Sequence, residues 1–372
     1  MNSVIELLQA LVRIPSVNPD GNPGTEMVGE QACAEFVGGF LEKCGARVEL
    51  QPVLTGRPNV IGRFPVDRRG KSRIIFAPHL DTVSVAGMCI DPFAAELRDG
   101  RIYGRGSTDT KGPMAAMLWA LWELRDAIPL MPYEIQFAGL MSEEAGQNGS
   151  KAFVQKYDPD GAPETFALIG EPTGCDVVHI HKGCIWLTLR TRGVAVHASM
   201  PECGENAIYK MADAIGILRG EFLPRLATLN DPVLGASSMS VGTVSGGSKT
   251  NIVPDYCEAT VDLRTIPGQD TQRLIREIQS RLAGVEISTV QSLPLFTDPA
   301  HPLILVLGRA GGKPVGAPWF SDAGVFSGAG IPAVAAGPGS IAQAHTTDEW
   351  MSIADLNRGV EFYRAFLLGL PG

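Results

Sequence analysis

Apolar residues along the first 175 positions follow two patterns that alternate. Short unbroken apolar runs, such as Ile74–Ala77, alternate with longer segments whose apolar residues recur at helical spacing, such as Met114–Ala127. The short runs are typical of buried strands and the longer segments of helices. Their alternation predicts an α/β fold with a mostly parallel sheet and helices on both faces. The expected elements are helices at 4–12 and 26–44 and from 114 and 149, with strands near 47–50, 59–63, 73–77, 134–141 and 166–170.

The pattern changes between residues 176 and 289. In this segment the strands alternate apolar and polar residues, as half-exposed strands do. The predicted order β-α-β-β-α-β is that of a ferredoxin-like unit. After residue 290 the first pattern returns and ends in a helix. We therefore predict one domain formed by residues 1–175 and 290–372, interrupted by an inserted domain at 176–289.

The composition is that of an ordinary globular protein, with 45% hydrophobic residues, 19% charged residues and a net charge of −9. A negative charge disfavours nucleic acids and anionic membranes as partners. No apolar run approaches the ~20 residues of a membrane span. The N-terminal segment 1–19 lacks a basic region and a cleavage site, so it predicts a helix and not a signal peptide. We expect a cytoplasmic protein without nucleic-acid or membrane partners.

The seven cysteines are scattered, and no two of them have C-x-x-C spacing. An odd number without paired spacing indicates neither a disulfide framework nor a zinc site made of cysteines. Reduced and mostly buried thiols are expected.

Polar residues follow several predicted strands at the end where an open α/β sheet binds its ligands. Alone, each of them is typical of a solvated surface group. Together they would meet at one edge of one sheet, which indicates a site. The residues are His79 and Asp81 after strand 73–77, Glu143 and Glu144 after 134–141, Glu171 after 166–170, Asp109 in a glycine-rich loop, and His345 after segment 332–340.

So many carboxylates repel one another unless cations neutralise them. Imidazole and carboxylate ligands without a thiolate suit zinc, and also cobalt or manganese. Two such metals about 3.5–4 Å apart can activate a water and polarise a carbonyl group. Asp81 shares a face with His79 on an extended chain, so it could accept the imidazole N–H and fix the tautomer.

Five motifs, in this order, resemble those of the M20 metallopeptidase family: PHLDTV, GRGSTDTKGPMAA, MSEEAG, GEPTG and AHTTDEW. The family includes acetylornithine deacetylase, succinyl-diaminopimelate desuccinylase, aminoacylase-1 and glutamate carboxypeptidase. The resemblance covers nearly the whole chain, including an inserted lid domain. The segments SDAGVF and GIPAVAAGPGSIAQAHTTDEW are most similar to the acetylornithine deacetylase branch.

The resemblance implies a role for each residue of the cluster. It implies one zinc ion held by His79, Asp109 and Glu171, and a second held by Asp109, Glu144 and His345, with Asp109 bridging. It implies that Glu143 is the general base, that Asp81 supports His79, and that a cis peptide follows Asp109. Neighbouring residues point apart on an extended chain, so one glutamate could bind metal while the other remains a base.

The resemblance also implies functional residues outside the cluster. His197 would stabilise the oxyanion, reaching the site of the partner subunit, so the lid domain would form a homodimer. Asn251 and Arg264 match substrate-binding positions, and an arginine can clamp a carboxylate with paired hydrogen bonds.

Gly337 and Gly339 could present N–H groups to the substrate. Asp322 lines the pocket or caps a helix, while His179, His181 and His301 are expected to be structural.

The expected function is the hydrolysis of the acyl amide of N-acyl-L-amino acids by a di-zinc site, with N-acetylornithine as the first candidate. Three alternatives keep this chemistry but change the substrate: a succinyl-diaminopimelate desuccinylase, a glutamate carboxypeptidase and a dipeptidase. A non-catalytic binding protein of the same fold would be expected to have lost a ligand or the base, and the chain retains all of them.

Overall fold

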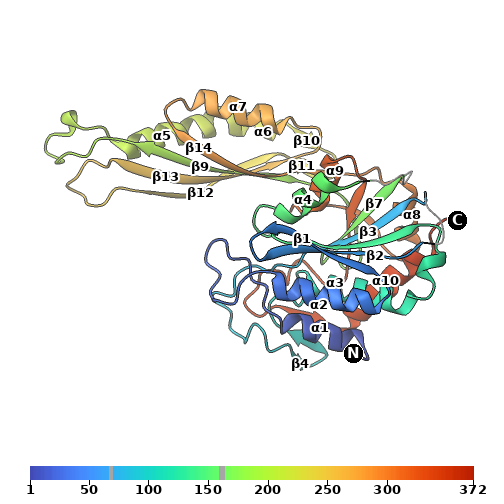
Figure 1. Cartoon of the computed structure of the whole chain (residues 1–372). Helices are drawn as coiled ribbons and strands as arrows, with labels where there is room; N and C mark the ends of the chain where they lie inside the picture. Colours follow the sequence, from blue (N-terminus) through green and yellow to red (C-terminus); the bar gives the residue numbers. More distant parts are fainter. Residues whose placement is uncertain (67–69, 159–163) are drawn as a thin grey trace. The chain divides into compact units, whose positions relative to one another are not determined.

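A computed structural model describes residues 1–66, 70–158 and 164–372, and its ribbon is drawn in Figure 1. The chain forms two compact units. Unit 1 consists of Met1–His179, Leu295–Gly316 and Ser321–Gly372, and unit 2 of Ile180–Pro294 and Ala317–Phe320.

The short segment Ala317–Phe320 belongs to unit 2, although the predicted boundaries assigned it to the first domain. The N–H of Lys182 donates to the carbonyl of Ala317 at 3.1 Å. The ring of Phe320 lies 5.9 Å from that of Trp186 in an edge-on contact. These contacts join residues more than a hundred positions apart, so sequence pattern alone does not show them.

Unit 1 is an α/β structure built around one large sheet. Its helices are α1 (Val4–Val12), α2 (Gln31–Lys43), α3 (Lys111–Leu124), η1 (Ile128–Leu130), α4 (Asn148–Lys156), α8 (Pro302–Arg309), α9 (Ala323–Gly328) and α10 (Ile353–Leu368). Its strands are β1 (Arg47–Leu54), β2 (Arg57–Arg63), β3 (Arg73–Pro78), β4 (Glu96–Arg98), β5 (Arg101–Tyr103), β6 (Glu134–Gly139), β7 (Thr165–Gly170), β8 (Val177–His181), β15 (Leu295–Phe296), β16 (Pro314–Ala317), β17 (Ala333–Ala335) and β18 (Trp350–Ser352). Strands β8 and β16 both end in residues of unit 2, at His181 and Ala317.

The strands of the large sheet follow the order β1-β2-β6-β3-β7-β17-β8-β15. The central strands β6, β3, β7 and β17 are parallel, while β1, β2 and β8 pair antiparallel. The carboxyl ends of β6, β3 and β7 therefore meet at one edge. The predicted α/β class is confirmed, and the departures from parallel pairing lie on either side of this centre.

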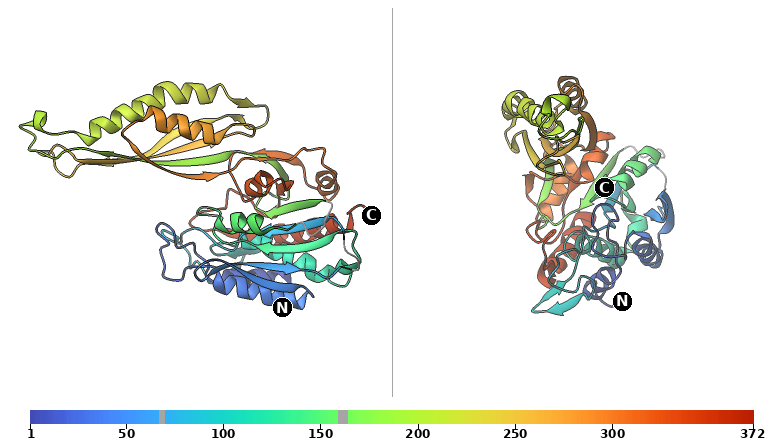
Figure 2. Two further views of the ribbon diagram at one scale, coloured as in Figure 1. Left: turned by 45° about the horizontal axis from the view of Figure 1, so that its top comes forward. Right: turned by 90° about the vertical axis from the view of Figure 1, so that its left-hand side faces the viewer.

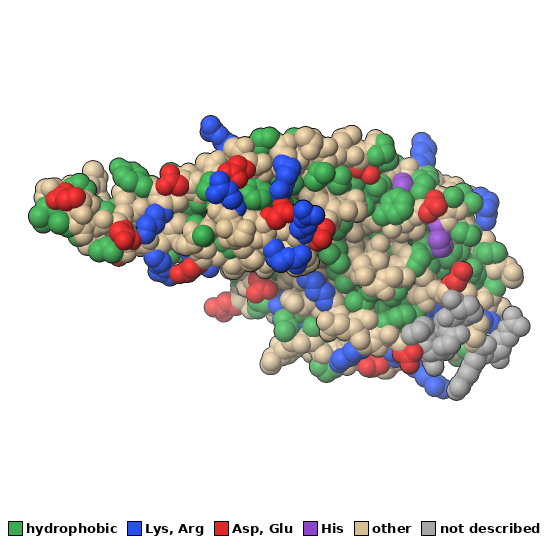
Figure 3. Space-filling view, turned by 90° about the horizontal axis from the view of Figure 1, so that it is seen from above, with side chains coloured by type: hydrophobic (Ala, Val, Ile, Leu, Met, Phe, Trp, Pro, Cys, Tyr) green, Lys and Arg blue, Asp and Glu red, His purple; other side chains and the backbone are tan. Residues whose placement is uncertain are grey.

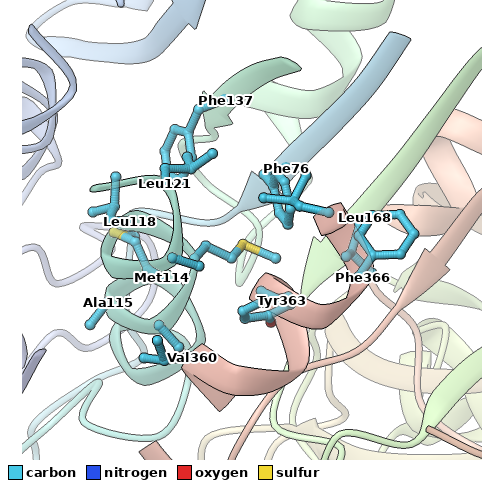
Figure 4. Close-up of a cluster of buried hydrophobic side chains, with 14 of the residues drawn as sticks. Phe76, Met114, Ala115, Leu118, Leu121, Phe137, Leu168, Val360, Tyr363 and Phe366 are labelled. Carbon is cyan, nitrogen blue, oxygen red and sulfur yellow. The ribbon is translucent and has the colours of Figure 1, made fainter. Parts of the chain in front are cut away.

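Helices cover both faces of the large sheet (Figure 1). Helices α1, α2, α3 and α10 lie on one face, and α4 and α9 on the other. The main core lies beneath α3 and α10, where the ring of Phe76 in β3 is nearly perpendicular to those of Tyr363 and Phe366, with centroids 5.7 and 6.4 Å away (Figure 4). Because α3 is covered by α1 and α10 as well as by the sheet, it is buried almost all round.

Two predicted helix starts are wrong by several residues: α3 begins at Lys111, three residues earlier than expected, and α2 begins at Gln31, five residues later. Gly29 has a φ of +91°, which a right-handed helix does not allow. Val28 instead forms a short parallel bridge with Val17. Residues 26–30 combine acidic and apolar side chains, as a helix does, but the left-handed conformation of Gly29 prevents the helix from including them.

Unit 2 contains a four-stranded antiparallel sheet with the order β12-β13-β9-β14. Its elements are β9 (Gly183–Arg192), η2 (Pro201–Cys203), α5 (Ala207–Ile217), the π-helical turn η3 (Leu218–Phe222), α6 (Leu223–Ala227), β10 (Asn230–Asp231), β11 (Gly235–Ala236), β12 (Ser238–Gly246), β13 (Tyr256–Thr265), α7 (Thr271–Arg281) and β14 (Glu286–Ser292). The order of the main elements along the chain is β-α-β-β-α-β, and the helices lie on one face of the sheet (Figure 2).

The outer face of these helices is charged, with basic and acidic side chains interspersed (Figure 3). Arg225 pairs with Glu277 at 2.7 Å, and Arg281 with Glu221 at 2.5 Å. Strand β13 alternates buried and half-buried residues along its whole length, and β9 alternates buried and more exposed residues from Ile185 onward. The buried residues of β9 and β13 pack under α5 and α7 and form a core within unit 2. Among the described residues of the whole chain, no helix is both long and apolar enough to cross a membrane.

Candidate metal centre

The cluster predicted from strand ends forms at the edge where β6, β3 and β7 finish. His79 directly follows β3, and Glu171 directly follows β7. Glu143 and Glu144 follow β6 after three intervening residues. Because these strands are parallel neighbours, their ends bring the side chains of distant segments to one place.

Asp109 lies between the two histidines of the cluster. Its Oδ1 is 3.1 Å from Nε2 of His79, and its Oδ2 is 3.3 Å from Nε2 of His345. Each oxygen of one carboxylate thus faces a different imidazole. This is the arrangement in which a carboxylate can bridge two cations. The Asp109–Thr110 peptide is cis, as the resemblance implied.

The remaining carboxylates complete a set of metal-binding donors. The ligand atoms of His79, Asp109 and Glu144 lie within 4.8 Å of one another. Oε1 of Glu144 is also 3.2 Å from Nε2 of His345. Glu171 is buried, and its Oε1 has no hydrogen-bond partner among the described residues. A buried carboxylate oxygen without a donor fits a cation ligand, so the residues present suit one or two divalent ions with nitrogen and oxygen ligands.

Burial and mutual repulsion disturb the ionisation of these groups. Burial, followed by the charge of Glu171, raises the pKa of Glu143 well above its usual value. Burial and the charge of Asp109 do the same for the pKa of Glu171. Asp109 shows the opposite shift, because hydrogen bonds from His345 and His79 outweigh burial and lower its pKa. The site therefore favours positive charge at its centre.

The pKa values of both imidazoles in the cluster are raised. Hydrogen bonds to Asp109 and Glu144 raise the pKa of His345 to about 10. For His79, burial alone would lower the pKa, but hydrogen bonds to Asp109 and Asp81 raise it well above the usual value. In the metal-free chain, protons on the imidazoles thus supply the positive charge that the carboxylates need.

Asp81 contacts His79, but mainly through its backbone. Nδ1 of His79 lies 2.9 Å from the main-chain carbonyl oxygen of Asp81 and 3.5 Å from its carboxylate. The carboxylate instead accepts hydrogen bonds from the N–H groups of Glu143 at 2.9 Å and Glu144 at 3.2 Å, and from the amide of Asn18 at 2.8 Å. Asp81 therefore orients the imidazole and also holds the main chain of the two glutamates.

The reason expected for the separation of Glu143 from Glu144 is wrong. These residues lie in a turn after Ser142, whose φ is +61°, and not on an extended chain. The turn directs Glu144 to His345, while Glu143 remains a separate buried carboxylate near Glu171. The two side chains therefore still occupy different environments, although Asp81 binds the N–H groups of both residues.

Gly337 and Gly339 pack beside the cluster. The N–H of Gly337 donates to Oγ1 of Thr173 at 3.1 Å. A Cβ at Gly337 would lie 2.8 Å from the carbonyl oxygen of Glu171. Glycine at this position therefore lets the chain pass close to Glu171, and a contact of either glycine with substrate stays a prediction.

Three predicted residues lie in unit 2. His197 is exposed, and its Nδ1 lies 2.7 Å from Oγ and 3.2 Å from the main-chain nitrogen of Ser199. The carbonyl of Asn251 accepts from the N–H of Ala198 at 3.0 Å, so these two segments are neighbours. Arg264 makes two hydrogen bonds to the carboxylate of Asp262, at 2.8 and 3.0 Å. Their roles at a catalytic site stay predictions.

The other three histidines contact neighbouring residues of the fold, and the expectation that they are structural stays a prediction. Nδ1 of His179 lies 2.9 Å from the carbonyl oxygen of Thr297. His301 stacks on Phe166 with ring centroids 5.0 Å apart. The ring of His181 lies 6.1 Å from that of Trp319, and burial lowers the pKa of this histidine to about 4.

Two features were missed or left open by the sequence. Asp322 is buried, accepts from Oγ of Ser150 at 2.5 Å and does not cap α9 with its side chain. Burial raises its pKa to about 6. Glu349, to which the sequence assigned no role, is fully buried and binds the loop that carries Asp109.

Comparison with known proteins agrees with this geometry. The sequence profile of peptidase family M20/M25/M40 matches residues 75–369. An acetylornithine deacetylase from Proteus mirabilis is 29% identical over 370 residues, which cover 94% of this chain and 92% of the relative. An acetylornithine deacetylase from Edwardsiella ictaluri is 28% identical, with coverage of 94% and 93%.

Solved structures show a similar fold. An M20 family metallo-carboxypeptidase from Sulfolobus solfataricus superimposes with a TM-score of 0.80 at 19% identity, covering 99% of both chains. A dinuclear metal binding peptidase of the M20 family from Bacillus subtilis has a TM-score of 0.65 at 14% identity, covering 98% of this chain and 96% of its own.

The raised pKa values predict that binding of Zn²⁺ to the metal-free chain releases protons. Because the pKa of His345 is about 10, this imidazole is protonated at pH 7 and must lose its proton to bind a cation. At least about one proton should leave per chain, and the affinity should rise by about tenfold per pH unit for each proton displaced. Calorimetry in two buffers of different ionisation enthalpy measures this number.

The substitution His345→Ala should lower the number of protons released, and His301→Ala, which removes a histidine outside the cluster, should leave it unchanged. An affinity that is independent of pH between 6 and 8 would contradict the assignment of these shifts.

Proposed function

The chain belongs to peptidase family M20/M25/M40 and is a metallohydrolase of that family, and from this premise we propose that it is a di-zinc amidohydrolase that deacylates N-acyl-L-amino acids. The observation that carries the proposal is the position of Asp109, with one oxygen facing His79 and the other facing His345. A carboxylate shared in this way supports two ions, and the nitrogen and oxygen donors suit zinc, with cobalt or manganese as substitutes.

We assign His79, Asp109 and Glu171 to one ion, and Asp109, Glu144 and His345 to the other. Such ions supply Lewis-acid chemistry, by polarising the amide carbonyl and making a water more acidic. The unpartnered oxygen of Glu171 and the contact of Glu144 with His345 support this division. Asp81 is left out of both sets, because its carboxylate already holds Asn18 and the backbone of Glu143.

Glu143 is the proposed general base. It is buried, and its main chain is fixed by Asp81. The carboxylate takes a proton from the attacking water and later gives one to the nitrogen of the leaving amine. Burial and neighbouring negative charge raise the pKa of Glu143, which makes it a stronger base than an exposed glutamate.

His197 is the proposed donor to the oxyanion that develops in the transition state. The tautomer with its proton on Nε2 would let Nδ1 accept from Ser199 while Nε2 donates to the oxyanion. Arg264 and Asn251 are the proposed contacts for the substrate carboxylate. Because Arg264 is paired with Asp262, a substrate carboxylate would have to share the guanidinium with Asp262 or displace Asp262 from it.

N-acetylornithine is the first substrate candidate, because the relatives from Proteus mirabilis and Edwardsiella ictaluri, which align along nearly the whole chain, are acetylornithine deacetylases. The structural similarity to a metallo-carboxypeptidase keeps peptide substrates as the second candidate. Both reactions hydrolyse a linear amide next to a carboxylate-bearing residue. They differ in the groups that flank this amide.

A substrate panel distinguishes these candidates. Initial rates on N-acetylornithine, N-acetylcitrulline, N-succinyl-diaminopimelate and dipeptides should be highest for an N-acetyl amino acid, as judged by kcat/KM. Faster cleavage of a dipeptide or of the succinyl compound would reassign the substrate but keep the metal chemistry. No hydrolysis of any of them by the zinc-loaded chain would contradict the proposal.

The substitution Glu143→Ala tests the assigned base. It should lower kcat by about 10²–10⁴-fold, the usual contribution of general acid–base catalysis, while the metal content remains at the level of the unsubstituted chain. Metal analysis and steady-state kinetics on the same preparation measure both. Glu361→Ala, which removes an exposed carboxylate from α10, is the control. Near-normal turnover in the Glu143 variant would remove the assigned mechanism.

A homodimer through unit 2 is also proposed. Strand β12 is an edge strand, so one side of its backbone has no neighbouring strand in the sheet. Apolar side chains are exposed on it and on the adjacent α5, namely Val244, Ile208 and Tyr209. A second copy would pair with this edge and cover these side chains.

Mixing two inactive variants tests whether His197 acts across such a dimer. Chains with His197→Ala and chains with Glu143→Ala should together regain about a quarter of the normal activity, because about half of the assorted dimers hold one complete site. Mixing Glu143→Ala with the double variant is the control and should give none. With subunit exchange demonstrated, absence of recovery would place His197 in its own chain's site or outside catalysis.

A further inference from the structure

Glu349 is a fully buried carboxylate in the segment between His345 and strand β18. Its Oε1 accepts hydrogen bonds from the N–H groups of Thr108 at 2.8 Å and Asp109 at 2.9 Å. Its Oε2 accepts from the N–H of Gly106 at 2.9 Å and from Nη1 of Arg105 at 2.8 Å. One side chain therefore binds three main-chain N–H groups of the loop that ends in Asp109.

The main chain of the same segment adds two further contacts with this loop. The N–H of Gly104 donates to the carbonyl of Glu349 at 2.9 Å. Oγ1 of Thr108 donates to the carbonyl of Trp350 at 2.6 Å. The loop before α3 and the segment 345–350, some 240 residues apart along the chain, are thus joined along their length.

Arg105 extends the connection to the neighbour of His345. Its Nη1 also donates to the carbonyl of Thr346 at 3.2 Å, and its Nε to the carbonyl of Ser84 at 3.0 Å. The guanidinium balances the charge of Glu349, so the buried carboxylate remains tolerable. The position of Asp109 and the backbone next to His345 therefore depend on one ion pair.

We propose that Glu349 is a positioning residue, which sets the place of the Asp109 carboxylate relative to His345 and thereby the affinity of the site for divalent cations. The inference rests on the proposed function, because it takes Asp109 and His345 as metal ligands. Both carboxylate oxygens of Glu349 already accept hydrogen bonds from the loop, so we do not assign Glu349 as a metal ligand. Its contribution is the orientation of the one carboxylate whose two oxygens face the two imidazoles.

The contacts of Glu349 make glutamine an informative substitution. Glutamine has the same size, but one of its two terminal groups is an NH₂ donor. Oε1 and Oε2 of Glu349 each accept from two donors. In either orientation of a glutamine amide, its NH₂ group would therefore face two N–H donors and could not accept from them. Glu349→Gln therefore disturbs the loop of Asp109 without creating a cavity.

The test measures binding of Zn²⁺ to the metal-free full-length chain, by competition with a chromophoric chelator, for the unsubstituted protein and for Glu349→Gln. The affinity of the variant should be lower by about 10–100-fold, as is usual when the partner of a ligand is removed. The control is Glu134→Gln, which removes the charge of the partly buried partner of Arg73 at the start of β3 and β6, away from the cluster. This variant should bind Zn²⁺ as the unsubstituted chain does.

The outcomes separate the two proposals. If the unsubstituted chain binds no Zn²⁺, the proposed function fails. If it binds two ions and Glu349→Gln binds them within about threefold of the normal affinity, the role of Glu349 is overturned. Should Glu349→Gln not fold, Arg105→Lys replaces it, because lysine keeps the charge but cannot reach Ser84, Thr346 and Glu349 together. A lower affinity in that variant supports the proposal, and an unchanged affinity overturns it.

Discussion

Carboxylates of Asp109, Glu143, Glu144 and Glu171 converge at one edge of the central sheet, and in a buried site like charges repel unless positive charge balances them. The pKa values show how the chain responds: the glutamates hold their protons more tightly, and both histidines become protonated more readily. Divalent cations would replace these protons. The parallel strands β6, β3 and β7 create this situation, because their carboxyl ends bring the acids to one edge of the sheet. The same sheet packs on the core beneath α3 and α10.

Buried carboxylates that are not proposed as metal ligands fix the segments that carry the ligands. Asp81 accepts the N–H groups of Glu143 and Glu144, and Glu349 accepts those of Thr108 and Asp109. Glu30, paired with Arg57, accepts the N–H of Ser142 in the same way. Loops are normally mobile, so a site built on loops needs such anchors to keep its ligand atoms within a few tenths of an ångström. Each anchor is itself balanced by a cation or an amide, which limits the cost of burying its charge.

In the proposed mechanism the two units supply different functional groups. Unit 1 holds every proposed metal ligand and the proposed base, so activation of water depends on one folded unit. Unit 2 carries His197, Asn251 and Arg264, the groups proposed to bind substrate and to stabilise the oxyanion. Its sheet leaves strand β12 at an open edge, beside the exposed Ile208 and Tyr209 of α5. Pairing of that edge with a second copy would connect oligomeric state with catalysis, because a donor held by one chain could then complete the site of another.

Local pattern was sufficient to predict the α/β class, the strands that end at the cluster and the residue types able to bind metal. Alternation of apolar residues reports what a segment buries, and this is a property of neighbouring positions. The start of α2 and the turn at Glu143 depended on backbone angles at Gly29 and Ser142, which apolar periodicity does not report. The role of Glu349 was beyond the sequence for a different reason: the N–H groups that it binds lie some 240 residues away. Hydrogen bonds act over about 3 Å of space whatever the separation along the chain, so only the tertiary structure decides which buried acid holds which loop.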